Sequence, residues 1–121
     1  MPLKKAPSTG RGNPVAMIEH IVLFKLRPEV DEKKVEWMLR ETRMSLLKIP
    51  SVRGLRCGYR LDPALEWPFF LLVELETAEK LDAYLNDPIH VRFVNDVIKP
   101  NISDRMVLDF RSDPGSDPFF S

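Results

Sequence analysis

The alternation of side chains near the N-terminus predicts a β-strand over residues 17–27. Successive residues of a strand point to opposite faces of a sheet, and apolar residues occur in both of the resulting rows, with Ile21 and Leu23 in the second. Both faces of this strand are therefore expected to be at least partly covered. One row consists of Ile18, His20, Val22, Phe24 and Leu26. Because His20 is the polar member of this apolar row, it is the first candidate for a functional side chain.

The pattern changes to a helical period after this strand. Pro28 ends the strand, and Asp31 is a suitable N-cap because its carboxylate can accept hydrogen bonds from free backbone N–H groups. Apolar residues then recur at spacings of three, four and seven to about residue 48, which predicts an amphipathic helix that Pro50 ends. Its buried stripe is expected to contain Val35, Met38, Leu39, Thr42, Leu46 and Ile49.

Renewed alternation predicts two further strands, over residues 52–61 and 68–76. The segment between them, residues 62–66, has the turn-forming residues and the length of a hairpin loop, so the two strands should be antiparallel. The single cysteine, Cys57, lies in the first of them and cannot form an internal disulfide. We interpret it as a small buried hydrophobic residue, with a catalytic thiol as the alternative.

Two helical segments and a last strand complete the predicted domain. A short helix begins after Thr77, and the sequence around Asp87 and Pro88 interrupts it. A second helical segment begins with Pro88 in its first turn and continues to about residue 99. The last strand is predicted over residues 105–110.

Both ends of the chain differ from the domain between them, which spans residues 17–110. Residues 1–16 contain basic but no acidic residues and few large apolar ones, which predicts a disordered extension. A cleaved organelle-targeting segment is the alternative. Residues 111–121 are expected to form an irregular tail, and Phe119 and Phe120 near its end are expected to pack against the domain or a partner.

The order strand, helix, strand, strand, helix, strand is that of the ferredoxin-like split βαβ fold. It predicts an α+β domain, with a four-stranded antiparallel sheet and helices on one face. The opposite face is too apolar for water, since it would carry Ile21, Leu23, Phe70 and Leu72. We expect a second copy of the chain to cover it, forming a dimeric α/β barrel around a two-fold axis. Tails folded over that face within one monomer are the alternative.

Composition limits the partners of this protein. Its 121 residues suffice for one domain, and its 18 basic and 18 acidic residues leave no net charge. Because nucleic acids and anionic membranes attract basic surfaces, neither is expected as a partner. No apolar run reaches the about 18 residues of a membrane span, and the N-terminus lacks the apolar core of a secretory signal, so a cytoplasmic location is expected.

The sequence offers little support for a metal or another cofactor. Its two histidines and scattered carboxylates lack the close spacing of a transition-metal site, so we expect none. Arg53, Arg56 and Arg60 are interpreted as solvated side chains of one strand. An anion-binding strip is the alternative, because alternate residues of a strand project together.

Three segments resemble the stress-responsive A/B barrel (Dabb) domain family. They are IEHIVLFKLRP at residues 18–28, VEL at residues 73–75 and DPIHVRF at residues 87–93. The resemblance covers about residues 17–110. It implies a ferredoxin-like protomer that dimerises through its sheet, with a cavity between sheet and helices. Family members include heat-stable plant stress proteins and a plant polyketide cyclase similar to olivetolic acid cyclase.

The resemblance to the cyclase implies a set of pocket residues. His20, Tyr84 and His90 would be its polar groups, and Asp109 on the last strand would orient His90. The sequence departs from the family at Asp87, because family members frequently have His at this position. The apolar lining is expected to contain Val22, Phe24, Leu71, Val73, Leu81 and Val94. Since Leu71 replaces a pocket histidine of the cyclase, the same substrate is not expected.

The residues and the resemblance are compatible with two functions. The first is a small homodimeric Dabb protein whose pocket holds a small apolar or polyketide-like ligand. The second is a cofactor-independent cyclase or isomerase, in which His90 removes a methylene proton while Tyr84 and His20 stabilise the enolate oxygen. A purely structural interpretation competes with both, because a core histidine, a helix-capping histidine and a core tyrosine need no ligand. A cavity of about 300 Å³ or more that both imidazoles face would favour a pocket.

Overall fold

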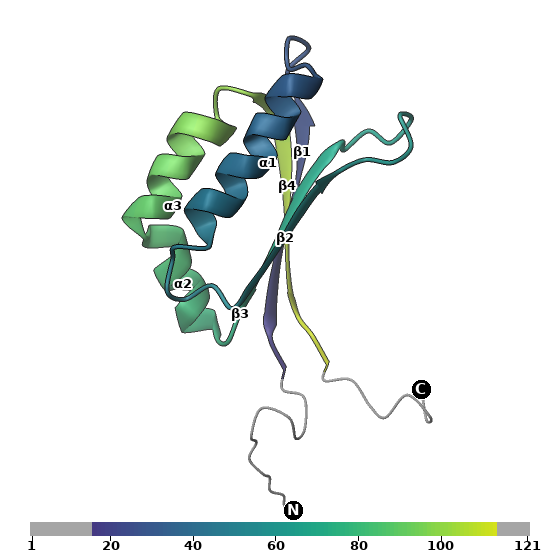
Figure 1. Ribbon diagram of the computed structural model, residues 1–121. Coiled ribbons are helices and arrows are strands. Elements are labelled where there is room, and N and C mark those ends of the chain that lie inside the picture. Colours follow the sequence, from purple (N-terminus) through teal and green to yellow (C-terminus); the bar gives the residue numbers. More distant parts are fainter. Residues whose placement is uncertain (1–15, 114–121) are drawn as a thin grey trace, which may run out of the picture.

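The computed structural model describes residues 16–113, which form a four-stranded antiparallel sheet with helices on one face (Figure 1). The strands are β1 (Ile18–Leu26), β2 (Gly54–Tyr59), β3 (Phe69–Leu75) and β4 (Ile102–Arg111), in the order β2-β3-β1-β4. The helices are α1 (Glu32–Leu46), α2 (Ala78–Asn86) and α3 (Pro88–Phe93), and a π-helical segment, η1 (Val94–Ile98), follows α3. This architecture confirms the predicted α+β, ferredoxin-like class.

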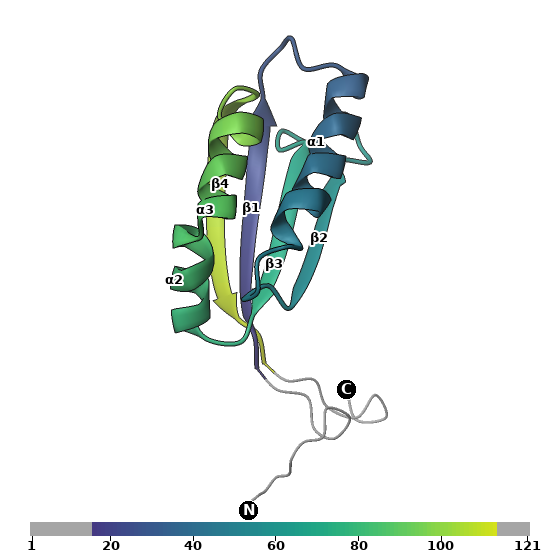
Figure 2. The same ribbon diagram turned by 60° about the vertical axis from the view of Figure 1, so that its left-hand side comes forward.

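The helices divide the covered face of the sheet between them. Helix α1 packs against the side that contains β2, whereas α2 and α3 lie over the side that contains β4 (Figure 2). The opposite face carries no helix in the described part of the chain (Figure 1). A site between sheet and helices is therefore bounded by β1 and β4 on one side and by α2 and α3 on the other.

The buried stripe of α1 fills the space above the sheet, as its spacing predicts. Met38, Thr42 and Leu46 are fully buried against core residues of the strands, including Phe69 and Val73. The hydroxyl of Thr42 donates a hydrogen bond of 2.7 Å to the backbone carbonyl of Met38, so the polar group of the stripe has a partner within the helix.

The helix starts predicted at Asp31 and Thr77 are confirmed, because each side chain accepts a backbone N–H there, and the structure adds a third cap at Asp87. Asp87 has two roles. Its extended backbone ends α2, and its carboxylate accepts the N–H of Ile89 at 2.8 Å in the first turn of α3. Pro88 occupies that first turn at no cost in hydrogen bonds. This joint sets the direction in which α3 crosses the sheet.

The C-terminal part of the domain differs from the prediction in two ways, whereas the middle strands are only shorter by one or two residues at each end. The second helical segment changes from α to π geometry at Val94, and the last strand begins at Ile102, three residues before the predicted start at Arg105. The reason for the second difference is that β4 pairs with the full length of β1 at the edge of the sheet. Residues of an edge strand are exposed and can be polar. The polar residues at positions 103–105 therefore lack the apolar alternation by which a strand is recognised in the sequence.

The pairing between the first and last strands extends further than predicted. Ser112 donates its backbone N–H to the carbonyl of Met17 at 2.8 Å, so the ladder continues beyond the expected end of the domain at residue 110. The predicted extension, except for its last residue, and the tail residues Phe119 and Phe120 lie outside the described residues. Between residues 16 and 113, none of the helices has the length and apolar character needed to cross a membrane.

Replacing Met38 by Ala should lower the free energy of unfolding by about 2–5 kcal/mol, because the truncation leaves a cavity in a fully buried site. The matched control is Met44→Ala on the same helix, where the side chain is 60% exposed. It should change the free energy by less than about 0.5 kcal/mol. Chemical denaturation at fixed protein concentration measures both, and equal losses would contradict the placement of Met38 in the core.

Candidate functional site

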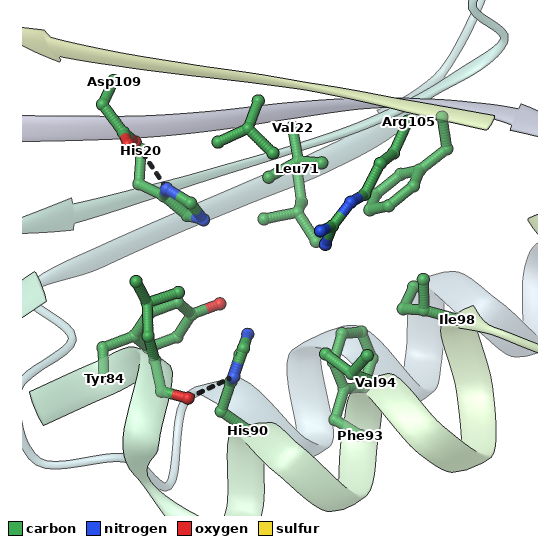
Figure 3. Close-up of a pocket in the computed structure, with 13 residues that line it drawn as sticks. His20, Val22, Leu71, Tyr84, His90, Phe93, Val94, Ile98, Arg105 and Asp109 are labelled. Atoms are coloured by element: carbon green, nitrogen blue, oxygen red, sulfur yellow. Dashed lines mark hydrogen bonds and ion pairs between the residues drawn. The ribbon is translucent and has the colours of Figure 1, made fainter. Parts of the chain in front are cut away.

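A cavity of about 260 Å³ lies between the helix-facing side of the sheet and the segment from α2 to η1 (Figure 3). This volume is below the about 300 Å³ set as the criterion from the sequence. An apolar cavity of about 150 Å³ is nevertheless enough to hold benzene, so the space accommodates a ring with substituents. Its apolar wall consists of Val22, Phe24, Leu71, Leu85, Phe93, Val94, Ile98 and Val107. Its polar groups come from His20, Tyr84, His90, Arg105 and Asp109.

His20 is buried and takes its orientation from the neighbouring strand. It lies opposite Asp109 in the register of β1 with β4, and its Nδ1 is 2.6 Å from the Asp109 carboxylate. A carboxylate accepts hydrogen bonds, so Nδ1 carries the proton and Nε2 faces the cavity (Figure 3). The expectation that Asp109 orients His90 is therefore wrong. The antiparallel register places Asp109 beside His20 instead.

His90 takes its orientation from a helix. Its Nδ1 donates to the backbone carbonyl of Leu85 at 3.0 Å, so in the neutral ring Nε2 is unprotonated and faces the cavity (Figure 3). Burial lowers the pKa of His90, and the charges of His20 and Arg105 also lower it, against the opposing effects of the Leu85 carbonyl and Asp87. A neutral imidazole with a free Nε2 can accept a proton at neutral pH.

Tyr84 lies between the two histidines. Its ring centroid is 5.7 Å from that of His20 and 4.5 Å from that of His90. Although the residue is only 1% exposed, its hydroxyl points into the cavity, and no group in residues 16–113 is hydrogen bonded to it (Figure 3). Burial raises the pKa of Tyr84 well above its usual value, so the hydroxyl keeps its proton and can donate it to a ligand.

The resemblance identified most of the cavity wall but not all of it. Val22, Phe24, Leu71 and Val94 line the cavity as expected. Val73 and Leu81 do not line it. Val73 belongs to the buried core, and Leu81 on α2 packs against that core.

Arg105 is the polar wall residue that the sequence analysis missed. It lies opposite Phe24 in the register of β4 with β1 and therefore projects to the helix-facing side. The sequence does contain a signal for Arg105. It lies four residues before Asp109, so both side chains are expected on the same face of the last strand.

The other sequence candidates have ordinary surroundings. Burial raises the pKa of the Cys57 thiol, although Arg43 opposes this effect, and a raised pKa is unfavourable for a nucleophile. Arg53 pairs with Glu76 at 2.8 Å, and Arg60 donates to the Leu65 carbonyl at 2.8 Å. Within the described range, no three His, Cys, Asp or Glu side chains gather as a metal site requires.

Comparison with known sequences identifies the family. The family model of the stress responsive A/B barrel domain matches residues 18–112. Over 104 residues, the chain is 31% identical to a stress-response A/B barrel domain-containing protein of Arabidopsis thaliana. That alignment covers 83% of this chain and 39% of the relative, so the chain spans well under half of the length of the Arabidopsis protein.

Solved structures share the fold at lower identity. A dimeric ferredoxin-like protein of unknown function from Thermobifida fusca has a TM-score of 0.73 and 24% identity, over 80% of this chain and 92% of that one. The hydroxynitrile lyase from Passiflora edulis has a TM-score of 0.71 and 14% identity, over 80% and 94% of the two chains. Below 25% identity, these similarities show the fold alone. The matches to the family model and to the Arabidopsis relative confirm the resemblance found in the sequence: this chain belongs to the stress-responsive A/B barrel (Dabb) domain family.

Proposed function

We propose that this Dabb protein binds a small, mostly apolar molecule in the cavity between sheet and helices. The observation that carries the proposal is the convergence of three polar groups on one apolar space: the Tyr84 hydroxyl and the Nε2 atoms of His20 and His90. These three atoms are accessible from the cavity and are not enclosed by protein, because among residues 16–113 the buried side-chain atom without a partner is Ser51 Oγ. A ligand in the cavity can therefore reach all three and form hydrogen bonds with them.

The purely structural interpretation accounts for only one of the two ring nitrogens of His20 and of His90. His90 does cap a helix, since its Nδ1 donates to a carbonyl of the last turn of α2, and His20 does have a partner in Asp109. In both rings, however, the second nitrogen is left to face the cavity (Figure 3). A core built for packing would have filled this space with side chains. The open cavity therefore favours a binding site, and polyketide-like molecules remain one candidate class of ligand.

Acid–base chemistry is the second candidate function, and the surroundings of the two histidines favour it. Neutral His90 would take a proton from a carbon next to a carbonyl group, at Nε2. Negative charge would then develop on the carbonyl oxygen, and the Tyr84 hydroxyl and a protonated His20 would stabilise it as donors. The Asp109 carboxylate, 2.6 Å from Nδ1 of His20, would hold the ring in the orientation that this role needs. A cyclisation or isomerisation of this kind needs no cofactor.

We also propose that the chain forms a homodimer through the uncovered face of its sheet. That face carries Ile21, Leu23, Phe70 and Leu72, and on β4 it adds Met106 and Phe110, which are 38% and 56% exposed in the monomer. The Thermobifida fusca protein with the same fold is dimeric. The zero net charge supports neither nucleic acid nor an anionic membrane as a partner, and a cytoplasmic location stays a prediction.

Replacing Tyr84 by Phe should weaken ligand binding about fivefold to tenfold, because it removes one hydrogen-bond donor from the cavity. The free energy of unfolding should change by less than about 0.5 kcal/mol, since no protein group loses a partner. Native mass spectrometry of the undenatured protein identifies the co-purified ligand, and calorimetric titration with it gives the affinities.

Tyr59→Phe is the matched control, because Tyr59 is 44% exposed on β2 and lies outside the cavity wall. It should leave ligand affinity unchanged. A Tyr84→Phe variant that loses stability without losing any ligand would support the structural interpretation instead.

The lowered pKa of His90 predicts a specific dependence of stability on pH. The unfolded chain binds a proton at His90 near pH 6.5, whereas the folded chain does so only at lower pH. The stability contributed by neutral His90 should therefore be complete above about pH 6.5 and be lost as the pH falls below it. Denaturation curves from pH 7.5 to 5 should show a shallower slope for His90→Asn. An NMR titration that places His90 at or above 6.5 would contradict this prediction.

A charge placed on the uncovered sheet face should separate the protomers. Leu72→Glu puts a carboxylate into the proposed interface, where an unpaired charge costs several kcal/mol, so the dimer should weaken at least about a hundredfold. Leu61→Glu is the control, because Leu61 is 99% exposed in the hairpin loop. Sedimentation equilibrium should show a dimer for the wild-type and control proteins and a monomer for Leu72→Glu. A monomeric wild-type protein would refute the interface.

A further inference from the structure

Arg105 brings a positive charge to the wall of the cavity. It faces the helices because it lies opposite Phe24 in the register of β4 with β1, and its guanidinium points into the cavity (Figure 3). Among residues 16–113, no carboxylate forms an ion pair with it. Its neighbour Asp104 accepts the backbone N–H of Arg105 and not the side chain. The guanidinium is therefore available to a ligand.

The two charged residues of β4 in the wall attach to the strand at well-separated positions. Asp109 supplies a carboxylate, but His20 already holds it at 2.6 Å. Asp109 and Arg105 are four residues apart on β4, which corresponds to about 13 Å along the strand. Apolar side chains occupy the wall between them, including Val107 on β4 and Leu71 on β3. The cavity thus has a cationic end, an apolar middle and an end with three hydrogen-bonding rings.

The guanidinium also affects the opposite end of the cavity. Its charge is one of the causes that lower the pKa of His90, after burial and the charge of His20. Arg105 itself is exposed at the edge strand, so its site lies at the mouth of the cavity. An anion bound there keeps part of its hydration, which reduces the desolvation cost that opposes buried ion pairs.

We propose that Arg105 determines the ligand class and that the ligand is an apolar molecule bearing one carboxylate. The guanidinium holds the carboxylate at the mouth, because its planar fork matches the two carboxylate oxygens. The apolar body lies along Leu71, Phe93 and Val94, and a hydroxyl or carbonyl group reaches the rings at the far end. This inference rests on the proposed binding function and extends it from a mostly apolar ligand to an anionic one.

Matched acids and primary amides test the inference, because the two members of each pair differ in charge and hardly in shape. The test ligands are hexanoate, octanoate, phenylacetate and 4-phenylbutyrate with their four amides, titrated at pH 7.5 in low salt by calorimetry or NMR. At least one acid should bind the wild-type protein about tenfold or more tightly than its amide, as a charge-assisted hydrogen bond requires.

Arg105→Met removes the charge and keeps most of the length of the side chain. In this variant the acid should bind no more tightly than the amide, while the affinity for the amide stays within twofold and shows that the cavity is intact. Arg111→Met is the matched control, because Arg111 is exposed on the same strand and does not line the cavity. It should keep the full preference for the acid.

Two outcomes overturn the inference and leave the proposed function standing. One is equal binding of acids and amides by the wild-type protein. The other is a preference for acids that persists in Arg105→Met. If none of the eight compounds binds to the wild-type protein, the binding function fails together with the inference that rests on it.

Discussion

The register of β1 between β3 and β4 is the constraint on which the site depends. In this register Val73 and Asp109 lie on either side of His20, and Arg105 lies beside Phe24, so the chemically active side chains of two strands share the helix-facing side. Strand side chains alternate with a period of two, so a slip of one residue would turn this set to the opposite face. The apolar rows of β1 and β3, buried under the helices, oppose such a slip and thereby also fix the polar residues.

The two histidines are chemically different because different groups hold their Nδ1 atoms. A backbone carbonyl holds His90 and a carboxylate holds His20, at 3.0 Å and 2.6 Å respectively. The Leu85 carbonyl orients the His90 ring and raises its pKa, but burial has the larger effect and lowers it, which favours the neutral ring. The carboxylate of Asp109 instead places a full negative charge beside the His20 ring. A neutral imidazole and an imidazole paired with a carboxylate therefore face the same space, with the Tyr84 hydroxyl between them.

Sequence reasoning found the elements and much of the site, and its errors have different causes. His20 was found because a polar residue interrupts an apolar row, and the break between the two helical segments because Pro88 has a known place in a first turn. The partner of Asp109 was assigned incorrectly because it depends on which strands are neighbours, whereas Arg105 was missed although it shares a face of the last strand with Asp109. Periodicity within a strand gives the face of each side chain but not the residue opposite, and the polar edge strand β4 showed only a weak pattern.

The distribution of polarity in the cavity argues against a copy of the cyclase chemistry. Leu71, which the sequence resemblance places at a pocket-histidine position of the cyclase, is 3% exposed and contributes to the apolar middle of the wall. The charge of Arg105 is instead placed at the mouth, on the edge strand. A ligand with a polar group at its centre would meet hydrocarbon here and leave that group unpaired, at a cost of about 1–3 kcal/mol. The proposed ligand is therefore polar at its two ends and apolar between them.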